Sequence, residues 1–226
     1  SDVDSISCTT PATGSYLTYS GSFDVAFSSA DATSYSEVAE SVTTTETGTN
    51  DFNDFIENYT VNNTITITYN GSSATYSGSV TNVAVAISGA NVTVTSAKKK
   101  MKYILKGTTT NGSFKVYSDY KYAVELSGVS ITNPTGPAIN LQSGKTVYVI
   151  LTANTTSTLC DGSSYAAATV KNGVTEDQKG TFFSEGQLIF SGTGALNITS
   201  LGGHAICSDD YVRVRKGTIN PLLGQR

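Results

Sequence analysis

The stretch Phe183-Ser184-Glu185-Gly186-Gln187-Leu188-Ile189-Phe190-Ser191-Gly192 shows most clearly how this chain folds. Two apolar residues, Leu188 and Phe190, stand four and six positions after Ser184. The same arrangement follows three other serines, which are Ser118, Ser143 and Ser208. Successive serines are separated by 25, 41 and 24 residues. A period of this length indicates a repeat architecture in the second half of the chain.

The long interval contains an insertion. A polar segment from residue 161 to residue 179 has 19 residues, and 41 minus 19 leaves 22. Four units of about 22–25 residues therefore follow one another, and one carries a surface loop. The positions four and six residues after each serine are apolar in every unit: Tyr122, Val147, Leu188, Val212, Val124, Val149, Phe190 and Val214. The residues between them are mixed, as expected for strands with one face in the core.

The repeat predicts an all-β fold. From about residue 61 onward, short runs of alternating apolar residues are bounded by Gly, Asn and Ser, which is typical of successive strands. One core column that recurs every 22–25 residues favours a parallel β-helix, because a single coil cannot bury its apolar side and stacked coils can. The alternative is a β-sandwich.

Composition divides the chain in two. Residues 1–60 form an acidic, Ser/Thr-rich lead-in that we expect to be extended or weakly ordered, and residues 61–226 form the β-helix. Residues 1–97 have no Lys or Arg and ten acids, whereas residues 98–226 have 14 bases and eight acids, so −10 and +6 sum to −4. A nucleic-acid binder needs a larger basic excess, so this class of function is not expected.

Residue counts and the lack of a long apolar run exclude or limit several other features. No apolar run is long enough for a transmembrane helix, and the acidic first residues are not those of a signal peptide. The single His excludes zinc sites built on several His. Three Cys allow one disulfide at most, which leaves the pairing of Cys160 with Cys207 open. Cys8 is expected to be a free thiol, with lipidation as the alternative.

Four stretches carry a resemblance to a known family. They are Lys115-Val116-Tyr117-Ser118-Asp119-Tyr120-Lys121-Tyr122, Gly128-Val129-Ser130-Ile131-Thr132-Asn133-Pro134-Thr135-Gly136-Pro137-Ala138-Ile139-Asn140, residues 179–192 and His204-Ala205-Ile206-Cys207-Ser208-Asp209-Asp210. Over about residues 61–220 the sequence resembles a bacterial secreted carbohydrate-binding domain family. The resemblance implies a right-handed parallel β-helix similar to that of pectate lyases. It also implies calcium and non-catalytic binding of cellulose and acidic pectins, outside the cell or on the bacterial surface. The family pattern stops near residue 220, and the acidic lead-in has no counterpart.

A calcium site is expected where acids occupy one corner of successive coils. Asp209 and Asp210 follow Ser208, while Glu185 and Asp119 stand at the same place in earlier coils. Stacked corners lie about 4.8 Å apart, and Ca²⁺ binds carboxylate and carbonyl oxygens. One ion is therefore expected to bridge Glu185 and Asp209, whereas Asp119 belongs to a different site. The alternative is that these acids cap turns by accepting hydrogen bonds from backbone amides.

A glycan-binding face is expected on the outward column of the strands. Its residues are Lys121, Tyr148, Tyr211, Arg213 and Arg215. Arginine pairs with carboxylates in a bidentate manner, and tyrosine rings stack on flat surfaces, so this column suits a polyuronate. The alternative is an ordinary solvated face.

Three functions follow from these features. The leading hypothesis is a secreted, calcium-stabilised polysaccharide-binding module that is not an enzyme. The second is a uronate polysaccharide lyase, which needs calcium and a base such as Arg213 or Lys121. The third is a surface structural or adhesive protein, for which self-association through an open β-helix end is expected.

Overall fold

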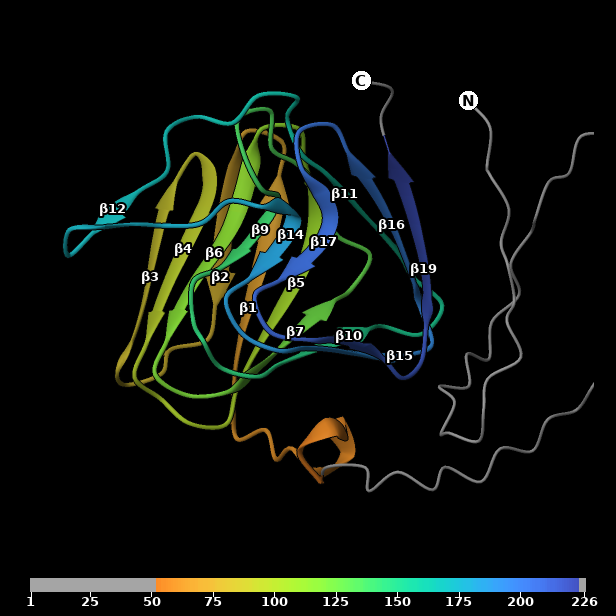
Figure 1. Cartoon of the computed structure of the whole chain (residues 1–226). Coiled ribbons are helices and arrows are strands. Elements are labelled where there is room, and N and C mark those ends of the chain that lie inside the picture. The colour runs from red at the N-terminus through yellow and green to blue at the C-terminus, as the bar shows by residue number, and fades with distance from the viewer. Residues whose placement is uncertain (1–51, 224–226) are drawn as a thin grey trace, which may run out of the picture. The chain divides into compact units, whose positions relative to one another are not determined.

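The strands of this protein stack on one another in parallel over most of the described chain (Figure 1). The computed structural model describes residues 52–223. Two short 3-10 turns, η1 (Phe52–Asp54) and η2 (Ile56–Asn58), precede the strands. The strands are β1 (Asn63–Asn70), β2 (Ser73–Ser77), β3 (Val83–Ser88), β4 (Ala90–Ser96), β5 (Met101–Thr109), β6 (Gly112–Ser118), β7 (Tyr122–Leu126), β8 (Ser130–Thr132), β9 (Ile139–Leu141), β10 (Val147–Leu151), β11 (Thr156–Cys160), β12 (Val170–Lys171), β13 (Val174–Thr175), β14 (Gly180–Ser184), β15 (Leu188–Gly192), β16 (Ala195–Ser200), β17 (His204–Ser208), β18 (Val212–Val214) and β19 (Thr218–Leu223). The predicted all-β class is confirmed.

Successive turns of the chain add strands to three parallel rows. The first row is β5–β7–β10–β15–β18, the second is β8–β11–β16–β19, and the third is β4–β6–β9–β14–β17. Strand β1 pairs in parallel with β5 and so precedes it in the first row, while the carboxyl end of β5 also pairs with β8 of the second row. Antiparallel hairpins β1–β2 and β3–β4 lie at the amino-terminal end of the rows.

The register of the first row confirms the repeat. Tyr122, Val147, Leu188 and Val212 are partners across the four strands β7, β10, β15 and β18. The column two residues further on is likewise aligned, since Val149 pairs with both Val124 and Phe190. The structure adds a fifth member that sequence reasoning left outside the repeat, because Met101 of β5 pairs with Tyr122.

These two columns form the interior between the rows. Val124, Val149 and Phe190 are completely buried, as expected for β-branched and aromatic side chains on the inner face of stacked strands. In the last described turn, Val212 and Val214 occupy the same columns but remain 44% and 40% exposed. Within the described residues, the interior is therefore continuous from β1 to β15, and the side chains of β18 are partly exposed.

The predicted insertion is confirmed at both ends, because β11 ends at Cys160 and β14 begins at Gly180. It contains the small hairpin β12–β13, whose Val170 and Val174 are exposed. Glu176 anchors the insertion to the third row: its carboxylate accepts hydrogen bonds from the Lys115 ammonium, at 2.7 Å, and from the Tyr117 hydroxyl.

The described residues also bear on the cysteines, on membrane-spanning helices and on the domain boundary. Cys160 and Cys207 are both free thiols, while Cys8 lies outside the described residues. No helix within residues 52–223 combines the length and hydrophobicity needed to cross a membrane. The compact unit that contains the stacked strands begins at Phe52, whereas the sequence placed its boundary after residue 60. The residues of the proposed lead-in up to position 51 are outside the described part.

Candidate functional site

Three carboxylates converge at one corner of the third row. Strands β14 and β17 pair in parallel with Ser184 opposite Ser208, so the residues that follow them, Glu185 and Asp209, come to the same corner. Asp177, from the end of the insertion, joins them there. One carboxylate oxygen from each of the three lies within 4.8 Å of the others. We call Asp177, Glu185 and Asp209 the acidic cluster.

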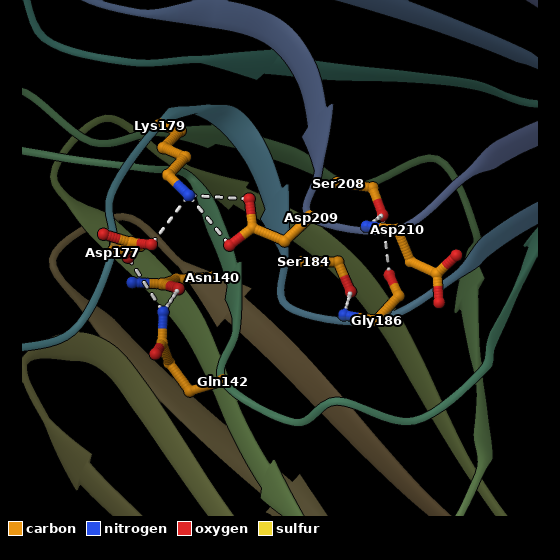
Figure 2. A network of polar contacts seen from close by, with 9 residues as sticks. All are labelled: Asn140, Gln142, Asp177, Lys179, Ser184, Gly186, Ser208, Asp209 and Asp210. Atoms are coloured by element: carbon orange, nitrogen blue, oxygen red, sulfur yellow. Dashed lines mark hydrogen bonds and ion pairs between the residues drawn. The ribbon is translucent and has the colours of Figure 1, made fainter.

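Lys179 pairs with two members of the acidic cluster (Figure 2). Its ammonium lies 2.7 Å from Asp177 Oδ2, and 2.7 and 2.8 Å from the two carboxylate oxygens of Asp209. The hydrogen bonds that its ammonium donates to Asp177 and then Asp209 raise the pKa of Lys179 well above its ordinary value. When all four groups are ionised, three carboxylates and one ammonium leave two negative charges in excess.

Glu185 is the member of the acidic cluster whose charge is least compensated. Burial raises the pKa of its carboxyl above the ordinary value, and the neighbouring charges of Asp209 and Asp177 raise it further, against a smaller opposing effect of Lys179. Like charges held this close favour either a bound proton or a bound cation. Carboxylates from three different segments are also the ligands that Ca²⁺ prefers. The cluster therefore has the chemistry of a cation site, provided that Lys179 moves aside.

The structure brings together two of the four acids predicted to bind a metal. Glu185 and Asp209 share the acidic cluster, as the stacking argument expected. Asp210 lies outside it: its carboxylate accepts a hydrogen bond from Gln187 Nε2 at 2.7 Å and points away from Asp177 (Figure 2). Asp119 follows β6 in an earlier turn, where its backbone N–H donates to the Ser96 carbonyl. The predicted metal roles of Asp210 and Asp119 stay predictions.

Sequence reasoning missed Asp177 because the insertion was treated as a surface loop. The signal was nevertheless present in the chain, since Glu176, Asp177 and Lys179 stand immediately before a strand of the third row. A tertiary contact holds this segment at the corner: Gln142 Nε2 donates to the Asp177 carbonyl at 2.8 Å. The period of the repeat does not indicate at which corner the end of a 19-residue insertion meets the stacked strands.

The predicted glycan-binding column is covered by the segment of residues 52–59, which we call the strap. Lys121 Nζ lies 2.8 Å from Asn53 Oδ1, and the Tyr148 hydroxyl donates to the Asn53 carbonyl at 2.5 Å. Beneath the strap, Tyr148 is only 1% exposed. Its register partners on the neighbouring strands are Ala123 and Ile189. It packs with both of them and with Ile56 and Tyr59 of the strap.

The three remaining residues of the column also contact the strap. The Tyr211 hydroxyl donates to Asp54 Oδ1 at 2.6 Å, and Arg213 forms an ion pair with Asp54 Oδ2. The Arg215 guanidinium lies 3.7 Å from the centre of the Phe55 ring. All five predicted glycan-binding residues thus have partners within the protein itself, and their role in glycan binding stays a prediction.

A model of the carbohydrate-binding domain-containing protein family matches residues 88–221, which is more than half of the chain. The chain belongs to this carbohydrate-binding family. The matched range contains the acidic cluster and the stacked strands from β4 to β18, with most of β19. It excludes the strap.

A solved structure has a similar fold. It is described as the polysaccharide lyase-like protein from C. thermocellum, as a gadolinium derivative. The TM-score is 0.60 and the sequence identity is 19%, over 70% of this chain and 61% of that one. At this identity the likeness is one of fold, and the present chain spans less than two thirds of the solved protein. No curated protein matches the sequence.

Proposed function

We propose that this protein is a secreted or cell-surface module that binds plant cell-wall polysaccharide without cleaving it. The glycan is an acidic pectin, with cellulose as a further ligand, and calcium is the cofactor. Membership of the carbohydrate-binding family supports the polysaccharide as partner. The observation that carries the proposal is the acidic cluster, in which three carboxylates from separate segments meet within 4.8 Å.

Asp177, Glu185 and Asp209 would hold the calcium ion. A calcium ion bound there supplies the positive charge that attracts the carboxylate of a uronate unit. In its absence, Lys179 compensates part of the charge by pairing with Asp177 and Asp209. The Lys179 side chain is 42% exposed and flexible, so it can leave the acidic cluster without disturbing the strands.

The fold we propose for the stacked rows is a right-handed parallel β-helix. Parallel pairing in three rows, with equivalent residues in register, supports it over a β-sandwich, whose sheets are antiparallel. Stacked coils present equivalent positions at regular spacing along one axis. A surface of this kind suits a polymer that contacts several coils at once.

The contacts of the basic residues support binding over lyase chemistry. β-Elimination from a uronate needs a base of lowered pKa near the metal. Lys179, the basic residue beside the acidic cluster, has a raised pKa while it donates hydrogen bonds to Asp177 and Asp209. Arg213 and Lys121, the bases considered from the sequence, contact the strap residues Asp54 and Asn53 instead.

Affinity electrophoresis tests the proposal. The wild-type protein is run through gels that contain polygalacturonate or a soluble cellulose derivative, with calcium or with a chelator. Retardation by polygalacturonate that requires calcium is the expected result. Unchanged mobility in all four gels would refute the binding module. A stable dimer without glycan binding would then favour the structural or adhesive function.

A further inference from the structure

A polar hollow of about 170 Å³ lies beside the acidic cluster. Its walls come from three parts of the chain: β6 contributes Ser113 and Lys115, the segment from Asn133 to Asn140 forms a second wall, and Gln178 closes it from the insertion. Gly136 leaves part of the wall without a side chain. A Cβ atom at this position would lie 3.2 Å from Gln178 Oε1 and 3.4 Å from Asn133 Nδ2.

The walls of the hollow are held in place by their own hydrogen bonds. Asn133 Nδ2 donates to the Pro137 carbonyl at 2.7 Å, and Asn133 Oδ1 accepts from the Thr135 backbone N–H at 3.1 Å. Asn133 is 9% exposed, so these bonds fix the loop from inside. Gln178 Nε2 donates to the Ala166 carbonyl at 3.2 Å. The hollow is therefore preformed, as small-molecule sites usually are.

The groups that face the hollow include both donors and acceptors. The Lys115 ammonium has three N–H donors and uses two of them on Glu176 and Thr169. Asn140 Oδ1 accepts a hydrogen bond from Gln142 Nε2, so the amide nitrogen of Asn140 points away from Gln142 (Figure 2). Gln178 Oε1 supplies an acceptor next to Gly136. Neighbouring hydroxyls of a sugar ring both donate and accept hydrogen bonds, so they match this set of partners.

The hollow and the acidic cluster share one segment of chain. Asp177 and Lys179 belong to the cluster, and Gln178 between them lines the hollow. Gln142 connects the two sites, because its Nε2 donates to Asn140 Oδ1 at 2.6 Å and to the Asp177 carbonyl at 2.8 Å. The cluster and the hollow therefore adjoin on the same segment of the chain.

We propose that the hollow is a subsite that takes one pyranose unit of the bound polysaccharide, next to the cation site. This inference rests on the proposed function. The ligand chemistry is a pyranose ring with free neighbouring hydroxyls, which galacturonate and glucose oligomers share. Lys115, Asn140 and Gln178 bind the ring hydroxyls, and Gly136 keeps the hollow open for it.

Isothermal titration with short oligosaccharides tests the subsite. Trigalacturonate and cellotriose are titrated separately, in calcium, into the wild type and three variants. Gly136→Val fills the hollow and is expected to weaken binding at least about tenfold, whereas Gln178→Ala removes one acceptor and weakens it about threefold or more. Gly144→Val is the control, because a Cβ at Gly144 has no neighbour within 4 Å. It is expected to bind as the wild type does.

The outcomes separate the subsite from the proposed function. A loss with trigalacturonate alone identifies a uronate unit, and a loss with cellotriose alone identifies a neutral one. If folded Gln178→Ala and Gly136→Val bind both sugars as tightly as the wild type, the subsite is refuted while polysaccharide binding stands. If Gly136→Val does not fold, Gln178→Ala decides alone. Absence of binding by the wild type to any oligosaccharide or polymer would overturn both proposals.

Discussion

Asp54 and Arg213 form an ion pair across 159 residues of sequence and thereby join the strap to strand β18. Asp54 is 2% exposed, and its carboxylate also accepts a hydrogen bond from Tyr211. A buried carboxylate is stable only when it is paired and hydrogen-bonded, and this one meets both conditions. The outward basic and aromatic column is thus a docking surface for the strap.

Removal of the Asp54 carboxylate is expected to destabilise the protein. Asp54→Ala leaves Arg213 and Tyr211 without their partner and should lower the free energy of unfolding by about 1–3 kcal/mol, measured by urea denaturation. Arg213 is 34% exposed, so solvent limits the loss. Glu57→Ala is the control, because the Glu57–Lys216 pair is 3.7 Å long and exposed, and it should change stability by less than about 0.5 kcal/mol. Equal losses in the two variants would contradict this role of Asp54.

Arg213→Gln is expected to leave glycan binding unchanged while it lowers stability. Its guanidinium is committed to Asp54, so a polysaccharide at the acidic cluster does not need it. Retardation in polygalacturonate gels should equal that of the wild type, and the midpoint of urea denaturation should fall. A folded Arg213→Gln protein that has lost retardation would instead place the glycan on the outward column, with the strap displaced.

The two core columns were predictable from the sequence, whereas the strap was not. Residues such as Val124, Val149 and Phe190 recur at a fixed offset because every turn of the chain must bury the same face. What covers the opposite face is set by tertiary contacts with a segment outside the repeat. Phe55, Ile56 and Tyr59 did give a local apolar signal, but it lay within a polar, acidic region.

Only the part of the acidic cluster that lies within the repeat was predictable from the sequence. Glu185 and Asp209 follow equivalent serines of adjacent units, so parallel stacking was enough to bring them together. Asp177 returns to this corner through hydrogen bonds of an insertion that has no counterpart in the other units. Lys179 pairs with the cluster because the same end of the insertion lies at this corner.

Equivalent valines in one column should differ in their contribution to stability. Val149 and Val214 occupy the same column, but Val149 is fully buried and Val214 is 40% exposed. Val149→Ala opens a cavity and should lower the free energy of unfolding by about 2 kcal/mol, whereas Val214→Ala should cost less than about 1 kcal/mol. Chemical denaturation followed by circular dichroism measures both. Similar costs would mean that the interior closes around β18 as well.

Calcium binding should weaken as the pH falls through the raised pKa of Glu185. A proton on this carboxyl competes with the ion, and the raised pKa brings the competition to a higher pH than an ordinary glutamate would. Without calcium, the folded state binds this proton more tightly than the unfolded state. The stability that the proton contributes is therefore lost as the pH rises through the raised pKa.

Calorimetric titration with calcium at several pH values, together with urea denaturation in chelator, measures both effects of Glu185. Glu185→Gln cannot titrate, so the pH dependence over this interval should disappear in both experiments. If the pH dependence of the variant equals that of the wild type, another group is responsible.

Calcium-dependent binding of polysaccharide at the acidic cluster is tested most directly by one pair of neighbouring substitutions. Asp209 belongs to the cluster, and Asp210 beside it is bonded to Gln187. Trigalacturonate is titrated in calcium into the wild type, Asp209→Asn and Asp210→Asn, each shown to be folded. We expect Asp209→Asn to lose binding at least about tenfold and Asp210→Asn to bind as the wild type does. Equal affinities in all three proteins, or a loss confined to Asp210→Asn, would contradict the assignment of the site.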